Sequence, residues 1–280
     1  MTMTSVIAPT STPTTTLALK ALRLPSMVRS WEELAGEATT HAWSHERFLS
    51  ALCELELSER TSRRLALRLS VAKLPPGKRL DSFEFNLVPG LSRARIAAMC
   101  AGDWIRSASN CLLFGGSGTG KTHIAAAIGY GLIEAGHSVL FTRTTDLVQR
   151  LQAARRDLAL PTLLAKLDRI DCLILDDLGY VRKDQSETSI LFELIAERYE
   201  HRSLIITCDR PFADWNSIFT DQTMTIAAID RLVHHATILE FGSESYRKRA
   251  ATHRVQHPDI APPTDIVTKR RATSQIATVR

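Results

Sequence analysis

Apolar positions in the first part of the chain recur at helical spacing. From Leu17 to Ala72 they form stripes without sustained strand-like alternation. We expect helices here, with His45–Ala72 forming one long helix or two shorter ones. Pro75–Gly77 ends the helical pattern. The pattern therefore predicts a small all-α domain over residues 17–76, preceded by a disordered polar tail over residues 1–16.

The rest of the chain alternates between strand-like and helical patterns after a connector over residues 77–109. The connector contains a predicted short helix at Arg93–Ala101, and we expect Trp104 to pack on the domain that follows. Pro161 divides one later helical segment into two short helices. The predicted strands are Cys111–Phe114, Ser138–Phe141, Cys172–Leu175, Leu204–Thr207 and Thr237–Phe241. This alternation predicts an α/β fold with a parallel five-stranded sheet covered by helices on both faces.

The two ends of the chain lack such periodicity. Residues 251–280 contain the basic cluster Lys269–Arg271, and we expect a flexible basic tail there. Residues 1–30 have no acidic residue and many Ser and Thr, a composition shared with organelle transit peptides, but we favour a disordered tail. No basic region precedes an apolar core, so a secretory signal is not expected. No apolar stretch approaches about 18 residues, so no membrane span is expected.

Composition narrows the class of protein only moderately. Hydrophobic residues make up 44% and charged residues 23% of the 280 residues, as in ordinary soluble proteins. The five cysteines are scattered without a C-x-x-C pair, which indicates a reducing cytoplasm and argues against structural zinc. The net charge of +5 permits a nucleic-acid partner without proving one.

A phosphate-binding loop stands out in the second part. Gly115–Thr122 has the pattern G-x-x-x-x-G-K-T between a predicted strand and a helical pattern. Glycines let backbone N–H groups face a polyphosphate, Lys121 can contact the β- and γ-phosphates, and Thr122 can hold Mg²⁺. We therefore expect ATP and Mg²⁺ as cofactors. The predicted nucleotide-binding residues are Gly115, Gly116, Ser117, Gly118, Thr119, Gly120, Lys121, Thr122 and His123.

Four further side chains are candidates for the chemistry. Asp176 and Asp177 directly follow a buried strand, whose carboxyl end should lie beside the loop. Asp176 can hold Mg²⁺ and Asp177 can act as a general base on water, although Asp is also common in ordinary turns. Asp209 ends the next strand and could reach the γ-phosphate. Arg231 could be an arginine finger for a neighbouring subunit; both of these could equally be surface charges.

A basic helix face is a candidate for DNA contact. Four arginines in the predicted long helix share one face because their spacing is helical, and such a face suits a phosphate backbone. Acidic residues lie just upstream, so a solvated helix surface is an equally good interpretation of the sequence. The four residues are Arg60, Arg63, Arg64 and Arg68.

Several motifs together resemble a known family. They are Gly115–Ala125, Leu173–Tyr180, Glu197–Ser203, Asp230–Ala236 and Glu244–Arg247. With the N-terminal helical stretch, they are similar to the IstB-like ATP-binding proteins of bacterial insertion sequences over roughly residues 17–250. The loop alone occurs in many NTPases, whereas the combination is much more specific.

The resemblance implies a P-loop AAA+ ATPase core over residues 110–250, of the initiator and helicase-loader clade related to DnaC. Such proteins act in the bacterial cytoplasm as transposition helpers: homo-oligomers joined through ATP interfaces that assemble on double-stranded DNA, remodel it and recruit a transposase. Walker A maps to Gly115–Thr122, Walker B to Asp176 and Asp177, and the arginine finger to Arg231. The implied DNA contacts are Arg60, Arg63, Arg64, Arg68, Arg150, Arg155 and Arg156.

Two departures from the family pattern are visible. The strand that usually ends in Thr-Ser-Asn ends here in Thr207-Cys208-Asp209, so a carboxylate replaces the expected γ-phosphate sensor. That charge should slow hydrolysis unless Mg²⁺ or an arginine neutralises it. The loop has Gly-Gly-Ser where Gly-Pro-Pro is usual, which should change little.

Three other functions share the same loop. A helicase loader of the DnaC type would use its N-terminal helices to hold a helicase instead of duplex DNA. An ATP-binding scaffold with almost no turnover is compatible with Asp209. A small-molecule kinase would need an arginine-rich lid, and no segment of the sequence has that pattern.

Overall fold

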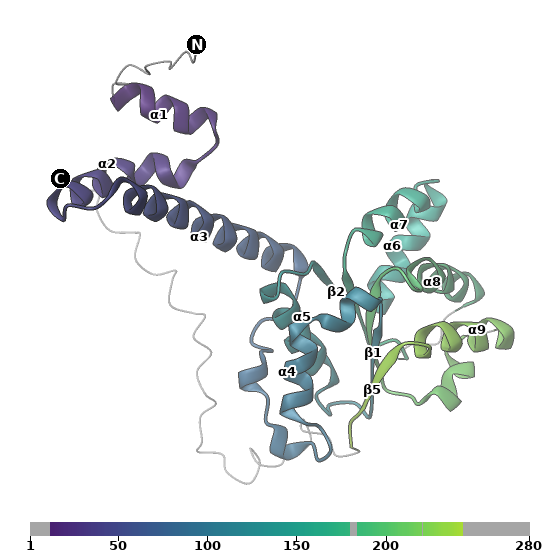
Figure 1. Cartoon of the computed structure of the whole chain (residues 1–280). Coiled ribbons are helices and arrows are strands. Elements are labelled where there is room, and N and C mark those ends of the chain that lie inside the picture. Colours follow the sequence, from purple (N-terminus) through teal and green to yellow (C-terminus); the bar gives the residue numbers. More distant parts are fainter. Residues whose placement is uncertain (1–11, 180–183, 220, 243–280) are drawn as a thin grey trace, which may run out of the picture.

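The computed structural model describes residues 12–179, 184–219 and 221–242, and the predicted basic tail lies outside them. The chain starts with helices and continues into an α/β unit (Figure 1). The first helices are α1 (Thr12–Ala21), α2 (Pro25–Thr40) and α3 (His45–Ala72). α3 is a single helix of 28 residues, whose start is capped by Ser44 and which ends at Lys73 in the left-handed conformation. It extends from the α1–α2 pair to the sheet (Figure 1).

α1 corrects one prediction. The helix begins at Thr12, so residues 12–16, which we expected to belong to a disordered tail, are helical. The Trp31 indole Nε1 donates a hydrogen bond to Thr16 Oγ1 at 3.2 Å, and α1 packs against α2. These tertiary contacts override the weak helix propensity of threonine, which sequence composition alone cannot show. Residues 1–11 of the predicted tail lie outside the described part.

The connector consists of short elements that pack on the α/β unit. They are η1 (Leu80–Ser82), η2 (Phe85–Leu87), α4 (Arg93–Ala101) and η3 (Asp103–Ser107). The bounds predicted for α4 are confirmed, as is the packing of Trp104 on the neighbouring core. Cys100 lies so close to Gly131 that a side chain at Gly131 would collide with it. The connector is therefore fitted against the helix that follows the phosphate-binding loop.

The sheet is parallel and five-stranded, as predicted. Its strand order is β2-β3-β4-β1-β5, so β1 lies between β4 and β5. All described strand pairs are parallel, which brings the carboxyl ends of the strands to one edge. The strands are β1 (Asn110–Phe114), β2 (Val139–Arg143), β3 (Cys172–Asp176), β4 (Ser203–Cys208) and β5 (Ala236–Glu240).

Helices cover both faces of this sheet (Figure 1). The two faces form separate cores because successive strand residues point in opposite directions. Ile174 packs in the core that α3, α4 and α5 cover, whereas Leu173 packs in the core that α6 to α9 cover. The predicted break at Pro161 is confirmed, because α7 begins at Leu160 as a separate helix with Pro161 in its first turn. The helices are α5 (Lys121–Glu134), α6 (Thr144–Arg156), α7 (Leu160–Asp168), α8 (Gln185–Arg198) and α9 (Gln222–Val233).

None of the helices in the described ranges is both long enough and apolar enough to cross a membrane.

Candidate functional site

The phosphate-binding loop joins β1 to α5 and depends on its glycines. Gly115, Gly118 and Gly120 have φ angles of 150°, 82° and 102°, a region that side chains disfavour. A Cβ atom on Gly115 would lie 2.7 Å from the carbonyl oxygen of Phe241, and one on Gly120 would lie 2.8 Å from Phe83 Cε2. The loop therefore requires glycine both for its backbone turn and for its close contacts.

Lys121, the first residue of α5, folds back onto the loop. It is 7% exposed, and its Nζ donates hydrogen bonds to the carbonyl oxygens of Gly115 at 2.6 Å and Gly116 at 2.8 Å. Burial lowers its pKa, while the negative charges of Asp177 and Asp209 act in the opposite direction. The ammonium group thus lies inside the loop beside two of the predicted carboxylates.

Asp176 connects the loop helix to the ends of two strands. Its Oδ1 accepts hydrogen bonds from Thr122 Oγ1 at 2.9 Å and from Thr207 Oγ1 at 2.6 Å. The carboxylate is 4% exposed. The two predicted metal ligands, Thr122 and Asp176, are therefore in direct contact. Their hydroxyl and carboxylate oxygens are ligands of the kind that Mg²⁺ prefers, so the residues fit that ion.

Thr207 is a site residue that the sequence interpretation missed. Besides its bond to Asp176, its Oγ1 accepts a hydrogen bond from the backbone N–H of Asp177 at 2.9 Å. In the sequence its only signal is its place in the unusual strand end Thr207-Cys208-Asp209. Its hydroxyl thus holds the carboxylate of Asp176 and the backbone of Asp177 in place.

Asp177 follows β3 in the left-handed backbone conformation, with φ of 58°. Desolvation raises the pKa of its carboxyl group, and the adjacent charge of Asp176 raises it further. Lys121 and Arg143 act to lower it. A carboxylate with raised basicity beside a phosphate-binding loop can accept a proton from water.

Asp209 belongs to the same cluster of charges. Phe114 pairs with Cys208, and the backbone N–H of Gly115 donates to the carbonyl of Cys208 at 3.3 Å, so Asp209 follows directly beside the loop. The Asp209 carboxylate lies against Gly179, where any side chain would collide with it. The structure thus places the Asp209 carboxylate beside the loop, where its charge acts on Lys121 and Asp177.

Arg231 lies in the last turn of α9, away from this cluster. Its Nη1 donates to the carbonyl oxygen of Ala227 at 2.9 Å, and its guanidinium lies 5.1 Å from the ring centroid of Phe192. β5 starts at Ala236, opposite Asn110 at the start of β1. Arg231 is therefore at the amino-terminal edge of the sheet, whereas the loop is at the carboxyl edge.

Comparison with known proteins identifies the family. The chain matches the IstB-like ATP binding proteins over residues 17–254. The chain belongs to this family. It is 56% identical to a putative insertion sequence ATP-binding protein of Sinorhizobium fredii over 242 residues, covering 86% of this chain and 81% of that protein. It is 34% identical to the IS21 putative ATP-binding protein of Pseudomonas aeruginosa, covering 82% and 86% of the two chains.

This IstB-like protein shares its fold with solved structures of two replication proteins. The DnaC helicase loader aligns with a TM-score of 0.52 at 22% identity, covering 60% of this chain and 98% of that one. AMPPCP-bound DnaA from Aquifex aeolicus also aligns with a TM-score of 0.52, at 16% identity, covering 66% and 56%. The predicted fold class and family resemblance are both confirmed.

His123 of the IstB-like chain contacts the connector. Its Nε2 lies 2.9 Å from the carbonyl oxygen of Arg79 and 3.3 Å from Ser82 Oγ, and its ring packs edge-on against Phe83. Only its backbone N–H therefore stays a candidate for phosphate contact.

Phe83 is a second position that the sequence interpretation passed over. Its ring also limits the space at Gly120. The alternation of Phe83, Phe85 and Leu87 was the available signal in the sequence.

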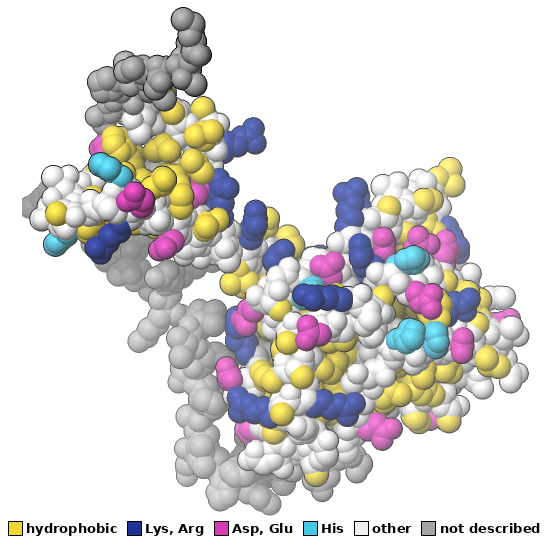
Figure 2. Space-filling view, in the orientation of Figure 1, with side chains coloured by type: hydrophobic (Ala, Val, Ile, Leu, Met, Phe, Trp, Pro, Cys, Tyr) yellow, Lys and Arg dark blue, Asp and Glu magenta, His cyan; other side chains and the backbone are white. Residues whose placement is uncertain are grey.

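The basic face of α3 is only partly available to a partner. Basic side chains lie along this helix (Figure 2), and all of those within α3 are arginines. Arg60 donates to Glu56 at 2.9 Å and to the carbonyl oxygen of Arg23 at 2.8 Å, and Arg63 donates to Ser26 Oγ at 2.8 Å. Of these two predicted DNA contacts, Arg63 thus ties α2 to α3, and Arg60 ties the turn before α2 to α3. Arg64 and Arg68 are the other two residues of the predicted face, and Arg64 is exposed.

Of the predicted DNA contacts on α6, one arginine already binds a carboxylate of the protein and another does not. Arg155 donates to Glu193 of α8 at 2.7 Å, while Arg156 is exposed at the end of the helix. Within the described part of the chain, Arg156 has no carboxylate within 4.0 Å. Arg156 is therefore the better candidate for contact with a phosphate backbone.

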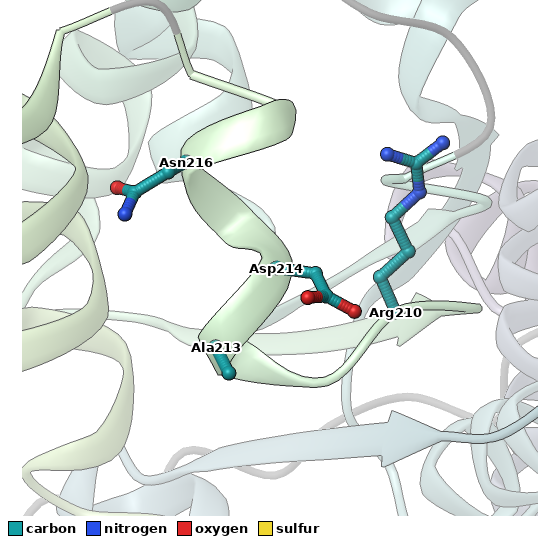
Figure 3. A pocket seen from close by; sticks show the side chains of 4 residues that line it. All are labelled: Arg210, Ala213, Asp214 and Asn216. Carbon is teal, nitrogen blue, oxygen red and sulfur yellow. The ribbon is translucent and has the colours of Figure 1, made fainter.

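A hollow of about 480 Å³ lies beside η4 (Phe212–Ser217). Figure 3 shows the Asp214 carboxylate pointing toward Arg210, whereas Asn216 points away from both. The lining residues are Arg210, Ala213, Asp214 and Asn216. None of these lining residues belongs to the predicted site, although Arg210 directly follows Asp209.

Proposed function

We propose that this protein is an ATP-dependent DNA-binding helper of an insertion sequence, which assembles on double-stranded DNA and recruits or stimulates a transposase. The observation that carries the proposal is the convergence of Lys121, Thr122, Asp176 and Asp177 at one edge of the sheet. The names of its relatives support the association with insertion sequences.

The same residues suggest how ATP would be bound and hydrolysed. Lys121 Nζ would exchange its bonds to the loop carbonyls for phosphate oxygens, while Thr122 and Asp176 would hold Mg²⁺. Mg²⁺ supplies positive charge that neutralises the phosphates. Asp177 would accept a proton from the attacking water as the bond between the β-phosphate bridging oxygen and the γ-phosphorus breaks, leaving ADP and phosphate.

DNA contact would use the arginines whose side chains make no internal bond. Arg64 and Arg156 are exposed and make no side-chain hydrogen bond or ion pair among the described residues. Arg63 and Arg155 are exposed as well, but they, like Arg60, already bind protein groups. A contact to the phosphate backbone needs a charge that can approach it without breaking an internal bond. We therefore assign the larger part of the DNA affinity to Arg64 and Arg156.

The test is duplex-DNA binding with ATP, with ADP and without nucleotide, for wild type and Lys121→Ala. Removing a charge-assisted contact should weaken ATP binding roughly 10- to 100-fold and abolish ATP-dependent DNA assembly. Lys166→Ala, which removes an exposed lysine from α7, is the matched control and should behave as wild type. Equal DNA binding under all nucleotide conditions would reject the proposal.

A helicase loader is the second candidate function. One basis is the fold shared with DnaC. The other is that Arg60 and Arg63 form hydrogen bonds within the protein, which leaves fewer arginines of the basic face for DNA. Pull-down with a replicative helicase and, in parallel, with a transposase separates the two functions. Capture of the helicase alone would favour the loader.

A further inference from the structure

A cluster of metal-binding side chains lies outside the nucleotide site. Glu200, His234 and His235 each offer a ligand atom, and these atoms all lie within 4.8 Å of one another. Glu200 follows α8, and the two histidines join α9 to β5. On the face shown in Figure 2, His side chains lie near acidic ones over the α/β unit. Two segments far apart in the sequence thus bring two imidazoles and a carboxylate together.

The backbone on both sides of the cluster is fixed. The carbonyl oxygen of His235 accepts a hydrogen bond from the Asn110 N–H at 2.7 Å, and the N–H of His234 bonds to the carbonyl oxygen of Asp230 at 3.1 Å. Glu200 has a φ angle of 59°, in the left-handed region that costs free energy for residues other than glycine. The sheet and helix therefore present these side chains from set positions.

A hydrogen-bond partner already orients one imidazole. The Tyr199 hydroxyl lies 2.7 Å from His234 Nδ1, and Glu200 Oε1 lies 3.9 Å from the same nitrogen. The rings of His234 and His235 have centroids 4.1 Å apart. Nδ1 is therefore the nitrogen of His234 that faces Glu200, and an ion held by these two residues would take the place of the Tyr199 hydroxyl at this nitrogen.

We propose that Glu200, His234 and His235 bind one divalent transition-metal ion of the zinc type. Two histidines and a glutamate form a known three-ligand set for Zn²⁺, with the fourth position left to water or another group. Ligands at about 2.0–2.1 Å from a tetrahedral ion are about 3.3 Å apart, so the side chains need to approach by at most about 1.5 Å. The exposed side chains of His234 (52%) and Glu200 (55%) can make this movement.

The position of this site indicates what the ion would do. Arg231 lies three residues before His234, at the end of the same helix. An ion bridging Glu200 to the two histidines would tie the turn after α8 to the end of α9. It would thereby restrict the segment that carries the proposed arginine finger. The spacing of cysteines gives no sign of this site, because its ligands are His and Glu.

The test is Zn²⁺ binding to the nucleotide-free full chain after removal of any histidine tag. Competition with a chromophoric chelator gives stoichiometry and affinity, and Co²⁺ gives a visible absorption band when imidazole and carboxylate bind it tetrahedrally. We expect one ion per protomer. His235→Ala and Glu200→Gln should each weaken binding at least about 10-fold.

His201→Ala is the matched control, because His201 is an exposed histidine beside Glu200 that is not part of the three-residue cluster. It should bind Zn²⁺ as wild type does, and Zn²⁺ should raise the Tm of wild type and control more than that of the two ligand variants. Circular dichroism verifies that each variant is folded. Absence of binding by wild type, or wild-type affinity in both ligand variants, would overturn the proposal.

Discussion

At the scale of single residues, the nucleotide site is a set of charges held by short hydrogen bonds. Lys121 binds loop carbonyls, and Asp176 accepts bonds from Thr122 and Thr207. Such charge-assisted bonds keep the groups in place before substrate arrives, which lowers the cost of ordering them later. Asp209 is different, because its carboxylate adds negative charge where a triphosphate would bind.

We expect Asp209→Asn to raise kcat for ATP hydrolysis by about threefold to tenfold. The amide keeps the size of the side chain but removes a charge that acts on both Lys121 and Asp177. Phosphate release at saturating ATP measures the effect. Asp157→Asn, at an exposed position after α6, is the control and should leave kcat unchanged. A kcat that stays equal or falls in Asp209→Asn would mean that the carboxylate assists hydrolysis.

At the scale of elements, the periodicity of the sequence predicted most of the fold. The buried runs at Cys111–Phe114 and Cys172–Leu175 lie within β1 and β3, because strands buried on both faces are continuously apolar. Local patterns could not reveal contacts between distant segments. Thr16 is helical because of Trp31, and Thr207 is a site residue because β4 lies beside β3.

Two arginines of α3 also make contacts with distant segments that local sequence patterns could not reveal. The spacing of Arg60 and Arg63 correctly put them on one helix face, yet that face packs partly against α2. Nothing local to α3 distinguishes an arginine that binds another helix from one that faces solvent. Only the tertiary arrangement separates these two from Arg64.

Glu56 provides a prediction about the junction of α2 and α3. Its buried carboxylate accepts hydrogen bonds from the N–H groups of Ser26 at 2.8 Å and Met27 at 3.2 Å, in the first turn of α2. Burial by itself would raise the pKa of Glu56, but the hydrogen bonds from Arg60 and these N–H groups outweigh it and lower the pKa. We expect Glu56→Gln to reduce the Tm by a few degrees at about pH 7.

The pH dependence of this effect follows from the lowered pKa. The folded pKa lies below the ordinary value of about 4.3, so the stabilisation is complete above that pH and is lost as the pH falls through the folded pKa. The difference in Tm between wild type and Glu56→Gln should therefore shrink below about pH 4. Glu59→Gln, which removes solvent-exposed ion pairs with Arg29 and Arg63, is the control and should have little effect at any pH. A Tm difference independent of pH would contradict the assignment.

At the scale of the whole molecule, the two halves of the proposed ATPase site lie at opposite edges of the sheet. The loop follows the carboxyl end of β1, and Arg231 lies near the amino end of β5. A five-residue strand spans about 16 Å, which is more than an arginine side chain can reach. Arg231 therefore cannot contact a nucleotide in its own loop, and a head-to-tail neighbour would bring the two edges together.

We expect Arg231→Ala to keep ATP binding but to lower hydrolysis roughly 10³-fold or more, because an arginine finger stabilises charge in the transition state. Nucleotide affinity and phosphate release, measured on the same samples, separate the two effects. Arg169→Ala, at an exposed position after α7, is the control for general loss of charge and should hydrolyse ATP as wild type does.

Mixing two inactive variants tests whether the arginine acts between subunits. In oligomers of Arg231→Ala with Lys121→Ala, an intact loop from the first variant can meet an intact Arg231 from the second. Some complete sites then form, so hydrolysis should recover in part and depend on the mixing ratio. If Arg231 instead acted on its own protomer, each chain would carry one defect at every site, and no ratio would restore activity.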